Sequence, residues 1–227
     1  MFYIIATPIG NLEDITLRAL KILQEVDVVL CEDTRVTRKL LDHYKIKNKK
    51  LEAYHQHTSE KKVERLVELI QKNKVALVTD AGTPGISDPG NKLISEIVKN
   101  NQTKIIPIPG ASAVTTALSI SGFPTDKFLF KGFIPHKKGR QKFLQEILQN
   151  KNTVVFYESP HRILKCLEQL NIFCRDRSRP VQLVVCRELT KKFETVYRGS
   201  AQEILGKIKT DFPDGKSVKG ELVVIVN

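Results

Sequence analysis

Residues 75–90, VALVTDAGTPGISDPG, have the composition of a loop that holds a small ligand. The apolar start of this segment predicts a buried parallel strand, and Gly82 and Gly85 follow it. Because glycine has no Cβ, both positions would let the backbone approach a ligand closely. Asp88 and Pro89 are suited to the cap and first turn of a following helix. A tight strand-to-helix connection without a ligand explains the same residues equally well.

Four further loops share this pattern, because each follows an apolar run and is dense in glycine, proline or charged residues. If the preceding strands are parallel, all these loops lie along the same sheet edge, where open α/β sheets bind their ligands. The loops are residues 7–11 (TPIGN), 32–35 (EDTR), 107–113 (PIPGASA) and 157–162 (YESPHR).

Two of these regions contain titratable side chains that could take part in catalysis. Residues 32–35 place two carboxylates and a guanidinium on one turn, although a surface ion pair or a helix cap is the commoner role of such a group. His55 and His57 alternate, which suits a metal site on a strand, but no carboxylate or third histidine recurs at ligand spacing. We therefore expect no metal, and His57 is a candidate proton acceptor or substrate contact.

The net charge of +12 lies mainly in the carboxyl-terminal half of the chain. Residues 1–120 carry 17 basic and 14 acidic side chains, whereas residues 121–227 carry 20 and 11. A positive field of this kind attracts polyanions such as nucleic acid, although a solvated lysine surface is the alternative. The basic groups in this half are Lys137-Lys138-Gly139-Arg140, Arg162, the alternating Arg175, Arg177 and Arg179, and the segment from Arg187 to Lys192 with Lys191.

The elements that must position these residues alternate between strands and helices. Strand-like runs occur at residues 2–6, 26–31, 75–79, 104–108, 128–134, 153–157, 181–186 and 221–226, with amphipathic helical patterns between them. One of these helices contains Ile163, Leu164 and Leu167 and is predicted to follow a cap at Ser159-Pro160. This alternation predicts an α/β fold. A change in charge density near residues 121–124 predicts two domains, residues 1–120 and 121–227.

The composition also predicts the cellular compartment. No apolar run approaches the roughly 20 residues of a membrane span, and the first residues lack the basic segment of a signal peptide. The four cysteines are far apart and form no C-x-x-C pair, which argues against a zinc site and a disulfide framework. We expect a protein of the reducing cytoplasm that does not enter a membrane.

Seven motifs in order resemble the tetrapyrrole methylase-like family of S-adenosylmethionine-dependent enzymes, and within it the members that modify small-subunit ribosomal RNA. The likeness runs from end to end of the chain, and several motifs in order are more specific than any one loop. The motifs are TPIGNL at 7–12, EDTR at 32–35, DAGTPGISDPG at 80–90, PGASA at 109–113, FYESPHR at 156–162, RELTK at 187–191 and KGEL at 219–222.

The resemblance implies two αβα domains with the methyl donor, S-adenosylmethionine, in the cleft between them, the class III methyltransferase fold. It also implies a homodimer that methylates the 2′-hydroxyl of a cytidine in the decoding region of 16S rRNA, with the assembled 30S subunit as the expected substrate. No metal is implied. The positions expected to contact the donor are Pro8, Gly10, Asp80, Gly82, Thr83, Pro84, Ile86, Ser112, Ala113, Tyr157, Glu188, Leu189, Glu221 and Leu222.

The reaction that the resemblance implies is an in-line displacement, for which a carboxylate or imidazole could accept the proton of the ribose hydroxyl. Asp33, Glu158 and His57 are the candidate proton acceptors, with Arg35 orienting a carboxylate or a phosphate. The sequence does not choose among them. The expected RNA contacts are Lys137, Lys138, Arg140, Arg162 and Lys191. Two other functions fit the same residues: a methylase of a small tetrapyrrole-like molecule, and a ribosome-assembly factor that binds rRNA without catalysis.

Overall fold

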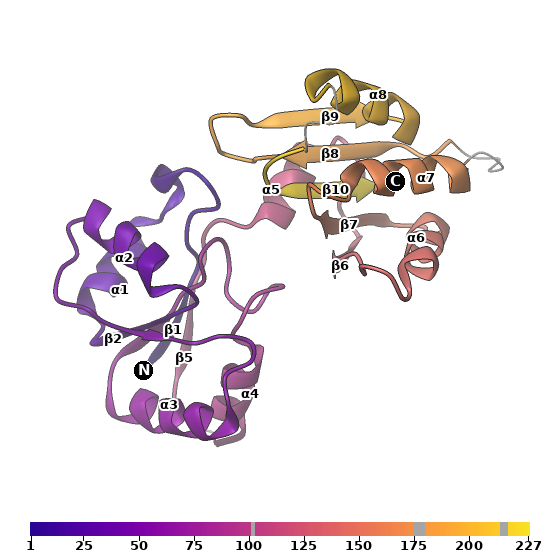
Figure 1. Ribbon diagram of the computed structural model, residues 1–227. Helices are drawn as coiled ribbons and strands as arrows, with labels where there is room; N and C mark the ends of the chain where they lie inside the picture. The colour runs from indigo at the N-terminus through magenta and orange to yellow at the C-terminus, as the bar shows by residue number, and fades with distance from the viewer. Residues whose placement is uncertain (101–102, 175–179, 214–217) are drawn as a thin grey trace. The chain divides into compact units, whose positions relative to one another are not determined.

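The computed structural model describes residues 1–100, 103–174, 180–213 and 218–227, and the chain divides into two compact units. Unit 1 is Met1–Ser112 and unit 2 is Ala113–Asn227. Each unit is built around its own five-stranded sheet. Figure 1 shows the strands and helices of each unit. The predicted α/β class with two sheet-containing domains is therefore confirmed. The described residues contain no helix that is both long enough and apolar enough to span a bilayer.

Unit 1 contains a fully parallel sheet of strand order β3-β2-β4-β1-β5. Its elements in chain order are β1 (Phe2–Ile5), the 3-10 helix η1 (Leu12–Asp14), α1 (Leu17–Glu25), β2 (Val28–Cys31), α2 (Thr34–His43), β3 (Lys50–Ala53), α3 (Glu60–Lys72), β4 (Val75–Leu77), α4 (Asn91–Asn100) and β5 (Ile105–Ile108).

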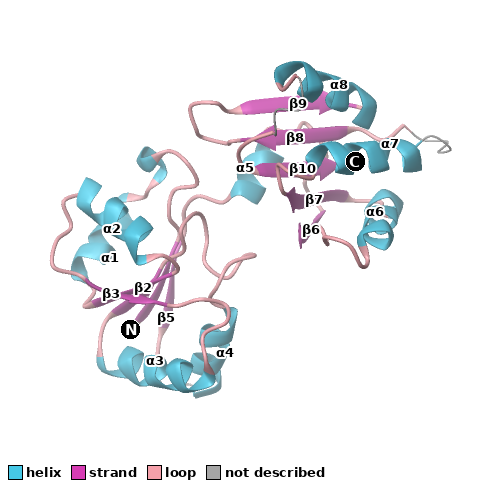
Figure 2. Cartoon of the chain, viewed as in Figure 1, coloured by secondary structure: helices cyan, strands magenta, loops and turns pink. Residues whose placement is uncertain are grey.

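Both faces of this sheet are covered by helices, and successive residues of a strand pack against opposite helix layers. Tyr3 and Ile5 of β1 pack in one hydrophobic cluster with residues of α1 and α2, whereas Phe2 and Ile4 pack in another with residues of α3 and α4. Successive strand residues point to opposite faces, so a strand covered on both sides reads as a continuous apolar run. Figure 2 shows α3 and α4 together on one side of these strands.

Unit 2 contains a mixed sheet of strand order β6-β7-β10-β8-β9. β6 and β7 are parallel, whereas β10 runs antiparallel to both β7 and β8, and β9 is antiparallel to β8. The elements are α5 (Ala113–Ser119), β6 (Phe128–Phe133), α6 (Arg140–Gln149), β7 (Thr153–Glu158), α7 (Ile163–Cys174), β8 (Leu183–Arg187), β9 (Thr195–Gly199), α8 (Ala201–Asp211) and β10 (Leu222–Val226).

The core of unit 2 lies between its sheet and three helices. Side chains of α6, α7 and α8 form one cluster with alternate residues of β7, β8 and β10, such as Phe156 and Val224. The intervening residues Val155 and Ile225 are also fully buried, and α5 packs against β7 and β10. Since α5 belongs with the second sheet, the two units divide between Ser112 and Ala113, eight residues before the division expected from charge density.

All eight predicted strands are present, and two further strands, β3 and β9, were not predicted. Two predicted helix caps were wrong. The helix after the first glycine loop begins at Asn91 rather than at Pro89, because the carbonyl of Gly90 accepts the first helical hydrogen bond from Ile94 (2.9 Å). The carbonyl of Pro89 instead accepts a bond from Gly85 (3.2 Å), which closes the loop on itself.

The second wrong cap concerns Ser159 and Pro160, which were expected to open α7. The helix begins at Ile163, and the carbonyl of Arg162 accepts its first bond, from Cys166 (2.9 Å). The carbonyl of Ser159 accepts a bond from the Arg162 N–H (2.9 Å), and its hydroxyl accepts one from the His161 N–H (3.3 Å). His161 and Arg162 therefore lie in a turn that precedes the helix.

Candidate functional site

The carboxyl edge of the parallel sheet in unit 1 gathers the loops that the sequence singled out. Residues 6–12 follow β1, residues 32–35 follow β2, residues 78–90 follow β4 and residues 109–112 follow β5, and all of these strands run in the same direction. The connection after β1 leads to α1 on one face of the sheet, and the connection after the adjacent strand β4 leads to α4 on the other. Ligands of open α/β sheets bind where neighbouring connections part in this way.

Backbone hydrogen bonds fasten these loops to one another. Thr7 and Gly82 exchange two N–H to carbonyl bonds of 2.9 and 3.0 Å. The Thr7 hydroxyl donates to the carbonyl of Thr79 (3.0 Å), and the Thr83 hydroxyl donates to the carbonyl of Ala111 (3.2 Å). The loops after β1, β4 and β5 therefore form one pre-organised backbone surface.

The glycines of this surface are required by the loops themselves. Gly82 and Gly85 have φ of 79° and 82°, in the region that side-chain-bearing residues rarely adopt. A Cβ on Gly85 would lie 2.7 Å from Oδ1 of Asn91. A Cβ on Gly110 would lie 3.0 Å from the Cβ of Ala6. Loop geometry is thus sufficient to explain these residue types.

The unit 1 positions predicted to contact the donor all lie on or beside this edge, and they differ in accessibility. Asp80, Ile86 and Gly10 are exposed, Thr83 and Ser112 are half-buried, and Pro8, Gly82 and Pro84 are buried. The exposed and half-buried members present one carboxylate, two hydroxyls, an isoleucine side chain and backbone groups. Such a surface suits a small molecule that carries few charges of its own.

Three carboxylates meet at the same edge. Oδ1 of Asp80 accepts a hydrogen bond from the backbone N–H of Asp33 (3.0 Å). Partial burial and the nearby charge of Asp80 raise the pKa of Glu32 above its ordinary value. This edge therefore carries a concentration of negative charge.

Asp33 and Arg35 have the role that the sequence left as an alternative, a helix cap with an ion pair. Asp33 is the N-cap of α2, and its Oδ1 accepts the Arg35 N–H (2.8 Å) while Nη2 of Arg35 lies 2.6 Å from Oδ2. The hydrogen bonds from the Arg35 side chain and backbone lower the pKa of Asp33 to about 2. Asp33 is therefore a weak base, whereas its neighbour Glu32, which sequence reasoning did not include among the bases, is a stronger one. The signal for Glu32 was its place as the first residue after a buried strand.

The remaining predicted donor contacts lie at one edge of the unit 2 sheet. Leu222 at the start of β10 pairs with both Glu158 at the end of β7 and Arg187 at the end of β8, which brings Tyr157, residues 188–189 and Glu221 to the same edge. Leu189 and Leu222 are buried, and Tyr157 is half-buried beside Phe130 and Phe133. Ala113 is the first residue of α5. This edge therefore combines apolar side chains with the charged Glu188 and Glu221.

Lys191 was expected to contact RNA, but its charge is already paired. Its ammonium lies 3.0 Å from Oε1 of Glu188 and 2.8 Å from Oε2 of Glu221. Burial by itself would raise the pKa of Glu188, yet hydrogen bonds from the Glu221 N–H and from Lys191 lower it below its ordinary value. The three side chains therefore lock the loop after β8 to the start of β10.

Glu158 and Arg140 are joined in a buried ion cluster, which departs from both predictions for them. Nη2 of Arg140 lies 2.8 Å from Oε2 of Glu158, and Nη2 of Arg162 lies 2.9 Å from Oε1. The side chain of Glu158 is fully buried and that of Arg140 is 6% exposed. Arg140 is therefore not an exposed RNA contact, and Glu158 is enclosed by two guanidinium groups rather than open to a substrate.

The other predicted residues are at the surface or outside the structure. Lys137, Lys138 and His57 are exposed, and His57 lies in the segment between β3 and α3. Arg175, Arg177 and Arg179 lie outside the described residues. Among the side chains that the structure does describe, no three histidine, cysteine or acidic residues are grouped as metal ligands would be.

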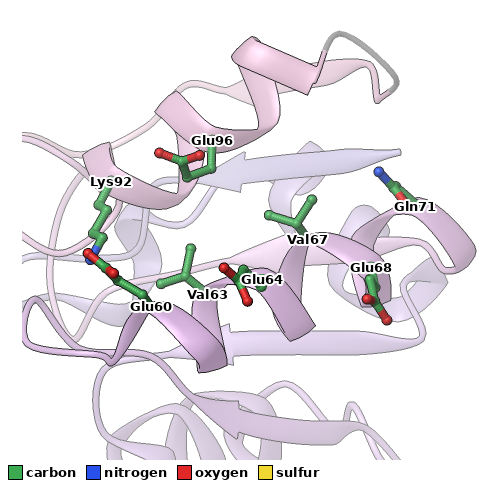
Figure 3. Close-up of a pocket in the computed structure, with 8 residues that line it drawn as sticks. All are labelled: Glu60, Val63, Glu64, Val67, Glu68, Gln71, Lys92 and Glu96. Atoms are coloured by element: carbon green, nitrogen blue, oxygen red, sulfur yellow. The ribbon is translucent and has the colours of Figure 1, made fainter.

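One hollow of unit 1 is acidic. It has a volume of about 500 Å³ and lies between α3 and α4 (Figure 3). Glu60 is on the α3 wall, whereas Lys92, which lies near it, and Glu96 are on the α4 wall. The lone lysine is 3.8 Å from Glu60 and leaves three carboxylates in excess. Phosphates would be repelled here, so this hollow does not suit nucleic acid. Its lining residues are Glu60, Val63, Glu64, Val67, Glu68, Gln71, Lys92 and Glu96.

Comparison with known proteins gives a family match and close relatives. The family model described as Tetrapyrrole (Corrin/Porphyrin) Methylases matches residues 1–205. The chain is 44% identical over 226 residues to a Halalkalibacterium halodurans protein named Ribosomal RNA small subunit methyltransferase I, covering 99% of this chain and 74% of that protein. The Thermotoga maritima protein of the same name is 40% identical over 225 residues, covering 99% and 96%.

Solved structures of the same fold have lower sequence identity. A cobalamin biosynthetic enzyme, cobalt precorrin-4 methyltransferase, matches with a TM-score of 0.69 at 20% identity, over 99% of this chain and 93% of that one. Diphthine synthase matches with a TM-score of 0.68 at 15% identity, over 99% and 88%. These likenesses establish the fold that the described strands and helices form.

Proposed function

Because the chain belongs to the tetrapyrrole methylase family, and within it to the ribosomal RNA small subunit methyltransferase I proteins, we propose that it transfers a methyl group from S-adenosylmethionine to small-subunit rRNA. The finer part of the proposal is that the acceptor is the 2′-hydroxyl of a cytidine in the decoding region. The observation that carries the proposal is identity of 40% or more to proteins of that name over 99% of the chain.

The residues of unit 1 fit a methyl donor of this kind. S-adenosylmethionine supplies an activated methyl group on a positively charged sulfonium. The edge with Glu32, Asp33 and Asp80 offers negative charge to such a cation, and Arg35 offsets part of it at Asp33. The tied backbone of the loops after β1, β4 and β5 adds hydrogen-bonding groups that need no reorganisation.

The residues of unit 2 fit the rest of the donor and the acceptor. The half-buried ring of Tyr157, beside Phe130 and Phe133, offers an aromatic surface that suits the adenine ring, with Leu189 and Leu222 buried beneath this edge. Unit 2 also holds nine of the twelve excess positive charges of the chain, which suits a polyanionic acceptor. We propose that residues of both sheet edges contact the donor. We also propose that the protein works as a homodimer, and light scattering of the purified protein tests this.

Transfer to a ribose hydroxyl requires alignment of the acceptor oxygen and removal of its proton. Alignment of reacting groups can supply about 7–11 kcal/mol of the barrier, and a positioned base about 10²–10⁴-fold in rate. Asp33 is a poor base because its pKa is about 2, and Glu158 is held by two arginines. Glu32, whose pKa is raised, and the exposed His57 are the better candidates, with Asp33 and Arg35 as positioning residues.

The decisive experiment incubates the protein with tritiated S-adenosylmethionine and either naked small-subunit rRNA or assembled small subunits. We expect label in the ribose of one cytidine, and only when the subunits are present. Label in the base would overturn the 2′-hydroxyl assignment. Absence of label with retained rRNA binding would favour an assembly factor, and label in a tetrapyrrole would favour a small-molecule methylase.

The base is identified by the pH dependence of kcat. A base acts when it is deprotonated, so activity falls as the pH drops through its pKa. If Glu32 is the base, Glu32→Gln lowers kcat by about 10²–10⁴-fold and abolishes the fall of kcat at low pH, whereas His57→Gln keeps that fall. If His57→Gln abolishes the fall instead, the assignment of Glu32 is wrong. Glu13→Gln, an exposed carboxylate of unit 1, is the matched control.

A further inference from the structure

A second hollow, in unit 2, has a lining opposite in charge to the one in Figure 3. It has a volume of about 430 Å³ and lies where α6 begins, beside α7. None of the described residues that line it is acidic, and five of the eight are histidine, lysine or arginine. We call it the α6–α7 basic pocket. Its lining residues are His136, Lys137, Gly139, Arg140, Gln141, Lys142, Lys165 and Gln169.

The backbone at this pocket adds positive potential. α6 has ten residues, and the first N–H groups of a helix have no partner within it. Its N-cap is Gly139, which provides no side chain to accept them, and its first turn contains no acidic residue. Of these N–H groups, that of Arg140 donates to the carbonyl of Lys137 (3.3 Å). Anions bind favourably at such a helix start because the unpaired N–H groups and the helix dipole point toward them.

A buried arginine fixes one wall of the pocket. Nε of Arg140 donates to Oε1 of Gln169 (2.8 Å), Nη1 donates to the carbonyl of Pro135 (3.3 Å) and Nη2 is paired with Glu158. These contacts come from α7, from the segment before α6 and from β7, so they hold the elements around the pocket in a defined arrangement.

The ion cluster behind this wall carries one positive charge in excess. Glu158 is the single carboxylate between Arg140 and Arg162, and the buried Nε and Nη1 of Arg162 make no hydrogen bond to the described residues. Arg140 brings this excess charge to the pocket wall, where it adds to the positive potential of the lining. An anion in the pocket would balance it.

We propose that the α6–α7 basic pocket binds a phosphodiester group of the rRNA substrate. The proposal rests on the proposed function for the identity of the polyanion. Lys142 of α6 and Lys165 of α7 are exposed side chains that come from the two walls and supply the contacts to the phosphate, together with the N–H groups of α6. Arg140 is a positioning residue that holds the walls. Phosphate contacts of this kind fix the register of an RNA without reading its sequence.

The test compares two double variants that remove the same charge from unit 2. Lys142→Ala/Lys165→Ala removes the two pocket lysines. Lys127→Ala/Lys151→Ala removes two exposed lysines near the amino ends of β6 and β7, where Phe128 pairs with Thr153. Lys151 follows the end of α6, so it lies about 15 Å along the helix from the pocket.

Binding of naked small-subunit rRNA is measured by fluorescence anisotropy across a series of KCl concentrations. Loss of one phosphate contact lowers the slope of log K against log salt by about 0.7–0.9. At 0.1 M salt, relative to 1 M, this corresponds to roughly five- to eightfold weaker binding. We expect this change in the pocket variant and the wild-type slope in the control variant, with unchanged affinity for S-adenosylmethionine in both.

The outcomes separate this proposal from the proposed function. Equal slopes in the two variants overturn the pocket, even if the wild type methylates small subunits. A selective loss of slope in the pocket variant supports the pocket, even if no methyl group is transferred, in which case the proposed activity fails by itself. A wild type that binds neither naked rRNA nor assembled small subunits overturns both.

Discussion

The clearest way to separate a structural role of Glu158 from a catalytic one is to remove its charge. Glu158→Gln keeps the size of the side chain and an oxygen that can accept the Ser159 N–H, which now donates to Oε1 at 2.7 Å. It leaves the guanidinium of Arg140, only 6% exposed, without an ionic partner. Arg162 is 19% exposed and can turn part of its charge toward water.

The expected cost follows from this burial. Two ion pairs of 2.8 and 2.9 Å are lost, and removal of one partner from a buried pair typically costs about 3–5 kcal/mol. This is a large part of the roughly 5–15 kcal/mol that stabilises a domain. Glu168→Gln is the control, because its ion pair with Lys209 is 3.3 Å long and about half exposed, so its loss costs about 0–1 kcal/mol.

The assay is native-state amide hydrogen exchange, which reports opening free energies segment by segment. We expect Glu158→Gln to lower those of β7 and β10 by about 3–5 kcal/mol and to leave β1 and β4 of unit 1 unchanged. Unchanged exchange in unit 2 together with loss of methyl transfer at saturating donor would refute the reasoning. Glu158 would then be a proton acceptor, as the sequence allowed.

Four smaller changes test local features. Gly82→Ala forces a Cβ onto a φ of 79°, so we expect a loss of about 1–2 kcal/mol in a urea melt and weaker donor binding by calorimetry. Gly206→Ala, in the open interior of α8, should instead stabilise by about 0.5–1 kcal/mol in the same melt. Ser200→Ala removes the side-chain cap of α8 and should cost about 1 kcal/mol in thermal unfolding. The pKa of Asp33 is lowered to about 2, so its stabilisation of α2 is present above about pH 4 and is lost as the pH falls through about 2. An NMR titration of the Arg35 amide, which donates to Asp33, should show this change. Asp33→Asn should abolish the titration.

The strands that sequence reasoning found differ from those it missed in burial. β2 and β4 are buried on both faces and read as apolar runs, so periodicity was sufficient to predict them. β3 (KLEA) and β9 (TVYRG) are edge strands with charged residues among half-buried ones. Each pairs with the strand before it, β3 with β2 and β9 with β8, and the mixed composition of an exposed edge strand gives no periodic pattern from which to predict it.

The loops of the candidate site were predictable because the carboxyl ends of parallel strands meet at one edge. The partners of individual side chains were not. Arg140 reads as part of a basic surface run, yet it is buried because Glu158 and Gln169, 18 and 29 residues away, receive its guanidinium. For Asp33, sequence reasoning gave an ion pair or a helix cap as the commoner role but also placed it among the candidate proton acceptors, and the structure pairs it with Arg35 two residues away.

Four carboxylates stand at or near the sheet edges, and their surroundings differ enough to give them different roles. Asp33 is neutralised by a guanidinium and caps a helix, and Glu188 is held by Lys191. Glu158 is enclosed by two arginines. The pKa of Glu32 is raised by partial burial and by the charge of Asp80, whereas those of Asp33 and Glu188 are lowered. A proton acceptor must be basic enough to take a proton from a hydroxyl, so the environment that raises the pKa of Glu32 is the one that suits it to that step.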